Sequence, residues 1–105
     1  PTVQAGVFEM APGGLLRSGF GLDAVDVGAV LNVLDHHLGF EGIHSREDMA
    51  PVKGLVASQA RKAVVLNADD ALCLGMRSRT QAPATLVSLR ADNPDVLQHR
   101  RAGGV

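Results

Sequence analysis

The sequence predicts a single α/β domain whose strands form a mostly parallel sheet. Three observations lead to this fold class. The chain has 105 residues, which suffice for one modest hydrophobic core. Apolar residues make up 46% of the chain and charged residues 20%, as is typical of a globular protein. Short apolar runs alternate with segments that begin in helix-capping residues, and this alternation favours parallel strands joined by right-handed crossovers.

The first half of the chain predicts two strands and one helix. Residues 7–10 (VFEM) form the first predicted strand, and residues 26–33 (DVGAVLNV) form the second. The second strand is mostly apolar on both faces, as a strand covered on both sides must be. A capping box, made by Ser45 with Asp48 three residues later, begins a helix. Pro51 in the second turn lacks a backbone donor, so we expect a kink or a late start there.

The second half predicts two more strands, each followed by a helix. The strands are residues 62–66 (KAVVL) and residues 84–89 (ATLVSL). Asp69 or Asp70 caps the helix after the first of them, and that helix extends to about Arg79. The run DNP at residues 92–94 begins the last helix, with its proline near the first helical position.

Composition and charge exclude several classes of function. The net charge of −1 and the absence of tryptophan and tyrosine argue against a nucleic-acid partner, which needs a basic face or aromatic stacking platforms. No apolar run is long enough to cross a bilayer, and the first residues do not resemble a signal peptide. The one cysteine, Cys73, cannot form an internal disulfide, and we expect it to be a small core residue. We therefore predict a cytoplasmic protein with neither nucleic acid nor membrane as a partner.

Polar residues follow three of the predicted strands. Glu9 closes the first strand, the run NVLDHH at residues 32–37 follows the second, and the run NADD at residues 67–70 follows the third. Ligands of parallel α/β proteins bind beyond the carboxyl ends of the strands, and carboxylate and imidazole groups there suit a divalent cation such as Mg²⁺. A local interpretation competes for the 67–70 run: its asparagine and aspartates end a strand and cap a helix.

Lys53 lies at the edge of the apolar stripe of its helix. A lysine in this position usually extends into water. The functional alternative turns it inward, toward Glu9 and His37. The sequence contains no phosphate-binding G-x-x-x-x-G-K-[ST] motif, no G-x-S-x-G elbow and no C-x-x-C pair. The residues alone therefore predict an α/β domain with a polar, cation-compatible rim.

Four stretches of the sequence, in order, resemble segments of the cyanophycin synthetases. They are FEMAPGGLLRSGFG, DVGAVLNVLDHHLGFEGIHSREDMAPVKGLV, VVLNADDALCLGM and SLRADNPDVLQHRRAGG. The wider group is the Mur ligase superfamily, whose central ATPase domain carries the motifs N-x-x-x-D-H and N-A-D-D. The resemblance implies that residues 1–105 are a single partial Mur ligase central domain, P-loop NTPase-like but without the phosphate-loop strand. Its last residues would enter the carboxy-terminal domain.

The resemblance also implies a reaction and residues that take part in it. ATP phosphorylates a carboxylate, an amine attacks the acyl phosphate, and an amide forms. In the cyanophycin branch the amine belongs to arginine and the carboxylate to an aspartate backbone, with Mg²⁺ screening the phosphates. Glu9 and His37 match metal ligands of the family. Lys53 matches a catalytic lysine that many Mur ligases carbamylate, which turns it into a further metal ligand.

The sequence also departs from the family pattern. Pro12, Leu31 and His36 stand where the family has arginine, threonine and aspartate. Because these residues include no phosphate loop, we expect that they do not bind ATP productively alone. The missing strand should expose an apolar sheet edge, to be covered by the missing domains of the full-length ligase or by self-association. The alternative is a stand-alone, non-catalytic module that acts through oligomerisation or partner binding.

Overall fold

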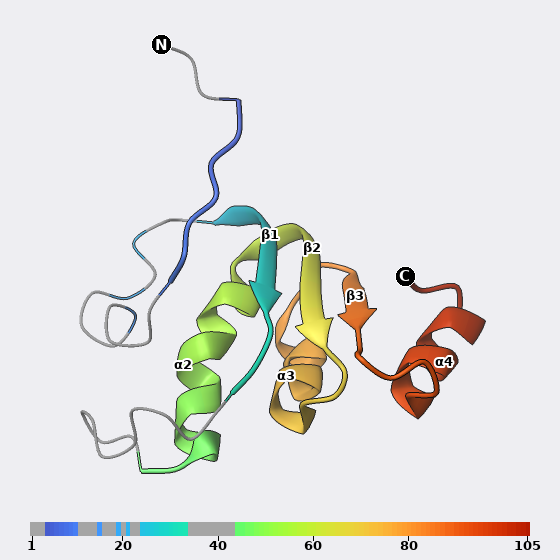
Figure 1. Ribbon diagram of the computed structural model, residues 1–105. Coiled ribbons are helices and arrows are strands. Elements are labelled where there is room, and N and C mark those ends of the chain that lie inside the picture. Colours follow the sequence, from blue (N-terminus) through green and yellow to red (C-terminus); the bar gives the residue numbers. More distant parts are fainter. Residues whose placement is uncertain (1–3, 11–14, 16–18, 20, 22–23, 34–43) are drawn as a thin grey trace.

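The computed structural model describes residues 4–10, 15, 19, 21, 24–33 and 44–105. The strands are β1 (Val25–Val30), β2 (Ala60–Asn67) and β3 (Ala84–Val87). The helices are α2 (Arg46–Ser58), α3 (Ala71–Gly75), the 3-10 helix η1 (Met76–Arg79) and α4 (Pro94–Arg101). Within this part of the chain, the strands form a three-stranded sheet in the order β1-β2-β3, and both pairings are parallel (Figure 1). The predicted α/β class with a parallel sheet is confirmed.

The predicted helix starts are confirmed at three caps. The hydroxyl of Ser45 accepts a hydrogen bond from the backbone N–H of Asp48 at 3.1 Å, and α2 begins at the next residue. Asp70 caps α3, and Asn93 caps α4. Pro51 lies inside α2, so of the two expected effects the late start is wrong, and the kink stays a prediction. The capping box and the burial of one face of α2 outweigh the single backbone hydrogen bond that proline removes.

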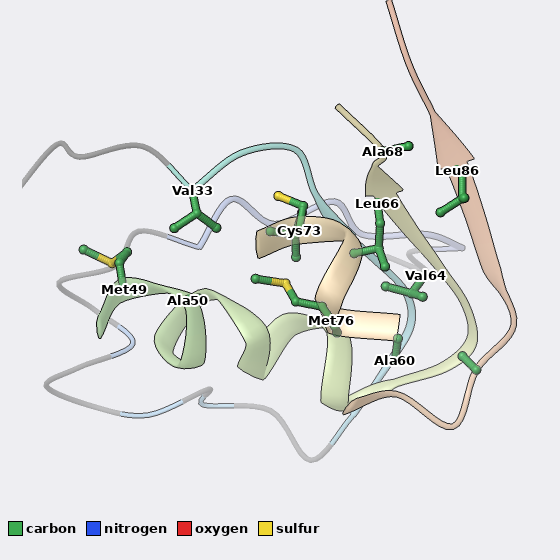
Figure 2. Close-up of a cluster of buried hydrophobic side chains, with 13 residues drawn as sticks. Val33, Met49, Ala50, Ala60, Val64, Leu66, Ala68, Cys73, Met76 and Leu86 are labelled. Atoms are coloured by element: carbon green, nitrogen blue, oxygen red, sulfur yellow. The ribbon is translucent and has the colours of Figure 1, made fainter. Parts of the chain in front are cut away.

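One face of the sheet packs against α2, α3 and η1. The core consists of side chains from this face, from those helices and from adjoining connections (Figure 2). Its fully buried members are Met49, Leu66, Met76, Val33, Val64 and Cys73. Gly28 sets how closely α2 approaches β1. A Cβ atom there would lie 2.6 Å from the backbone oxygen of Val56, so any side chain would push the helix away.

The opposite face of the sheet is open within the described residues. Its side chains, in register across the strands, are Val27, Ala29, Ala63, Val65, Asn67, Thr85 and Val87. Val27 is 56% exposed and Val87 is 40% exposed, and Leu31 continues this face beyond β1 with 57% exposure. Among the described residues β1 is therefore covered on one side only, and its coverage on the second side stays a prediction. Its apolar residues alternate between a buried face and an exposed one, a difference that composition alone does not reveal.

The predicted strand at residues 7–10 does not form. Residues 5–10 have no regular secondary structure, and Val7 and Phe8 are 99% and 69% exposed. A strand requires a neighbour to satisfy its backbone groups, and the pattern of side chains cannot supply one. β3 ends at Val87, earlier than predicted, because the next two residues bond to Asp69 instead of continuing the sheet.

The carboxy-terminal residues return to the free edge of β3. The backbone N–H of Leu86 donates to the carbonyl oxygen of Val105 at 2.9 Å, and the ring of His99 bonds the carbonyl oxygen of Ala84. In the part of the chain that the structure describes, no helix is both long and apolar enough to cross a membrane.

Candidate functional site

Three residues that follow β1, Leu31 to Val33, form the centre of the polar rim at the carboxyl end of the sheet. Each of their three carbonyl oxygens accepts a hydrogen bond from a side chain of another element. The donors are Asn67 Nδ2 to Leu31 O at 2.9 Å, Lys53 Nζ to Asn32 O at 3.0 Å and Arg46 Nε to Val33 O at 2.6 Å. Because the donors come from β2 and α2, this segment is fixed against both elements.

Asp70 holds the same segment from the other side. Its Oδ2 accepts the backbone N–H of Val33 at 2.8 Å, and its Oδ1 lies 3.2 Å from Nη2 of Arg46. The same Oδ1 caps α3 by accepting the N–H groups of Leu72 and Cys73. Burial alone would raise the pKa of Asp70, but these backbone hydrogen bonds and the charge of Arg46 hold it below the ordinary value. The carboxylate is therefore ionised and joins β1, α2 and α3.

Asp69 has different partners, although it is adjacent in sequence. Its carboxylate accepts from Ser88 Oγ at 2.6 Å, Asn93 Nδ2 at 2.7 Å and Leu89 N at 2.8 Å. These bonds lower the pKa of Asp69. Asp69 fastens the connection between β3 and α4, whereas Asp70 is the helix cap. The local interpretation of the 67–70 run is thus confirmed for Asp70, and Asp69 has a second structural role.

Lys53 turns toward the end of β1. Its Nζ donates to the backbone oxygen of Asn32 and also to the side-chain Oδ1 of Asn32, at 3.0 and 3.1 Å. It borders an open cavity of about 120 Å³, which is lined by Met10, Leu15, Ala29, Val30, Leu31, Asn32, Lys53 and Val56. The ammonium group therefore lies where parallel α/β proteins bind their ligands.

The predicted trio of Glu9, His37 and Lys53 is placed only in part. Glu9 is exposed, and the neighbouring Met10 lines the cavity that Lys53 borders. His37 lies outside the described residues, so the convergence of the three side chains stays a prediction. Among the residues with described positions, no three His, Cys, Asp or Glu side chains are close enough to hold a metal ion. An ammonium group cannot ligate a cation either, so these side chains alone do not make a metal site.

Sequence reasoning missed two members of the rim, Arg46 and Asn32. In the sequence Arg46 stands inside the capping box, and Asn32 begins a polar run, so neither position indicates a member of the rim. Their partners are distant in sequence: Arg46 bonds a residue 13 positions away, and Asn32 one 21 positions away. Neither spacing follows a helix or strand period, so only a three-dimensional arrangement reveals the contacts.

A second feature at the carboxyl end of the sheet is an apolar depression. An open depression of about 170 Å³ is lined by Leu31, Asn67, Val87, Ser88 and Leu89. It lies where the open face of the sheet meets the rim, and Leu89, which lines it, is fully exposed.

Cys73 is buried on the covered side of the sheet. Burial together with the nearby Asp70 raises the pKa of its thiol to about 11. Its predicted role as a small core residue is confirmed.

Comparisons with known proteins give a consistent relationship. No family model matches the chain. Over 107 aligned residues, which include the whole chain, it is 43% identical to the cyanophycin synthetase of Geminocystis herdmanii, 42% to that of Synechocystis and 44% to that of Crocosphaera subtropica. The chain spans only 12% of the length of each of these curated relatives. The resemblance inferred from four ordered stretches is confirmed from end to end.

Proposed function

We propose, from the premise that this chain is homologous along its whole length to a segment of the cyanophycin synthetases, that it belongs to an ATP-dependent amide ligase. In this proposal a carboxylate oxygen of an aspartate attacks the γ-phosphorus of ATP and releases ADP. The amine of arginine then attacks the acyl phosphate, an amide bond forms, and phosphate leaves. The end-to-end similarity to a ligase carries this proposal.

Lys53 is the residue that connects the fold to this chemistry. It reaches the carboxyl end of a parallel sheet, and its charge there attracts the anionic phosphate and carboxylate groups of such a reaction. Mg²⁺, held by Glu9 and His37, belongs to the proposal and would neutralise further phosphate charge when bound. Lys53 would join these ligands only if carbamylated, in place of its role as an ammonium group. Because the described side chains do not complete a metal site, the role supported by contacts is that of the Lys53 ammonium.

The proposal assigns ATP binding to the whole ligase rather than to these residues alone. The chain contains no phosphate-loop motif, so the triphosphate would be held by other parts of a longer polypeptide. The domain assignment made from the sequence, a partial Mur ligase central domain at residues 1–105, is part of the same proposal. Such a ligase would work in the cytoplasm, where ATP is supplied.

The experiment is an assay of the natural protein that contains this chain. ADP release should require both an aspartate-containing acceptor and arginine, and mass spectrometry should show an acceptor that has gained one arginine residue. ADP release that ignores the acceptor, or the absence of any arginine adduct, would contradict the proposal.

The open face of the sheet favours a second candidate, a non-catalytic module that acts by association. Parallel sheets are normally covered on both faces, and here Val27, Leu31 and Val87 leave an uncharged apolar surface. In the ligase, other domains would cover this face. In a stand-alone module, a second copy or a partner would cover both this face and the predicted strand edge. The intact mass of the natural protein and its sedimentation separate the candidates: a natural product of 11.0 kDa that forms dimers supports the module.

A further inference from the structure

We propose that Asp70 and Arg46 are positioning residues for Lys53, and that they act through the backbone that follows β1. The importance of Lys53 rests on the proposed ligase function, whereas its positioning depends only on contacts in the structure. Neither Asp70 nor Arg46 bonds Lys53 directly in the hydrogen bonds of the described rim.

The peptide group between Asn32 and Val33 is the link. Its N–H belongs to Val33 and donates to Asp70 Oδ2 at 2.8 Å, and its C=O belongs to Asn32 and accepts from Lys53 Nζ at 3.0 Å. A trans peptide group is planar, and its N–H and C=O point in opposite directions. Asp70 therefore fixes the orientation of this peptide group from its N–H side, and Lys53 is bound on its C=O side.

The charges on the two sides of this peptide group reinforce each other. A carboxylate at the N–H and an ammonium at the C=O both favour the same orientation of the peptide dipole, so each strengthens the bond made by the other. The carboxylate side is the better defined, because Asp70 is only 9% exposed and its lowered pKa keeps it charged. The Asp70 bond is thus the fixed end and the Lys53 bond the dependent one.

Arg46 restrains Val33, the residue on the N–H side of this peptide group. Its Nε donates to the carbonyl of Val33 at 2.6 Å, and its Nη2 contacts Asp70 at 3.2 Å, so both backbone groups of Val33 are held by one ion pair. The side chain of Val33 is fully buried in the core, which fixes the residue from a third direction (Figure 2). Asn32 follows from this fixed point, and both oxygens that bind Lys53 belong to it.

The chain provides internal controls for a test. It contains two lysines, Lys53 and Lys62, and the side chain of Lys62 is 75% exposed with one weak ion pair at 3.9 Å. Asp69 is a matched control for Asp70, because it is the adjacent carboxylate and also accepts several hydrogen bonds, but it fastens β3 to α4.

The experiment is competitive acetylation of the natural protein that contains this chain, with the ratio of Lys53 to Lys62 modification read by mass spectrometry. Asp70→Asn places an amide NH₂ against backbone donors, and we expect the ratio to rise about fivefold to tenfold, as for the loss of one ordinary hydrogen bond. Arg46→Gln, at a side chain that is 43% exposed, should raise it in the same direction. Asp69→Asn should leave the ratio unchanged.

The outcomes are decisive. An unchanged ratio in both Asp70→Asn and Arg46→Gln overturns the proposal, and so does an equal rise in Asp69→Asn, because that would indicate general loosening. If circular dichroism shows that Asp70→Asn does not fold, Arg46→Gln decides alone. The failure of the ligase function is separate: a wild-type protein without ligation that still shows this labelling pattern removes the function and keeps the positioning.

Discussion

Replacing Gly28 with alanine tests how the approach of α2 to β1 supports the site. The new Cβ would lie 2.6 Å from the carbonyl oxygen of Val56 and 3.1 Å from its Cγ1, so α2 must move away from β1. Overpacking of this kind costs about 1–3 kcal/mol, and the lower entropy of the unfolded alanine chain offsets roughly 0.4–1 kcal/mol of that. We expect a net loss of about 1–2 kcal/mol in the free energy of unfolding.

The same displacement affects Lys53, which lies three residues before Val56 on α2 and bonds Asn32 at the end of β1. Urea unfolding of the 105-residue chain, followed by circular dichroism, measures the loss of stability. Gly75→Ala is the matched control, because a Cβ at Gly75 meets nothing within 4 Å and alanine favours a helix. Equal stability of Gly28→Ala and wild type, or an equal loss in Gly75→Ala, would refute the packing argument.

Three further results are expected. The pKa values of Asp69 and Asp70 lie below the ordinary 3.8 in the folded state, so their stabilisation is complete above that value and is lost as the pH falls through the folded pKa values. The urea midpoint should therefore drop steeply in acid, and part of this drop should come from Asp69. If the midpoint of Asp69→Asn dropped by the same amount as that of wild type, Asp69 would not contribute. Cys73 should resist a thiol reagent at about pH 8 until urea unfolds the protein, and fast labelling of the folded chain would show that it is not buried. Ser45→Ala should lower stability by about 1 kcal/mol, and an unchanged unfolding midpoint would mean that the cap at Asp48 contributes nothing.

The elements that sequence reasoning placed correctly are those whose signals are local. Ser45 bonds a residue three positions away, and Asn93 bonds residues two and three positions away, so the helix starts can be read from short motifs. The strand predicted at residues 62–66 is the centre of β2. β2 lies between the other two strands of the sheet, so its apolar run is a reliable sign of a buried strand.

The features that it missed depend on contacts between distant segments. Val33 and Asp70 are 37 positions apart, and Asp69 and Leu89 are 20 apart, so no spacing rule joins them. The sequence shows that either aspartate could cap a helix. It does not show that Asp70 bonds the segment after β1 whereas Asp69 bonds the segment after β3. The open face of the sheet was missed for the same reason. The apolar residues of a strand indicate that it can be buried, but they do not indicate which segment packs against each face.

The most direct test of the account replaces Lys53 with glutamine in the natural protein and measures ATP-dependent addition of arginine to the acceptor. Lys62→Gln is the control, because Lys62 is exposed at the other end of the sheet. We predict that Lys53→Gln lowers kcat by roughly a hundredfold or more with unchanged folding, and that Lys62→Gln has no effect. Wild-type kcat in Lys53→Gln would show that the carboxyl-end lysine takes no part in the chemistry.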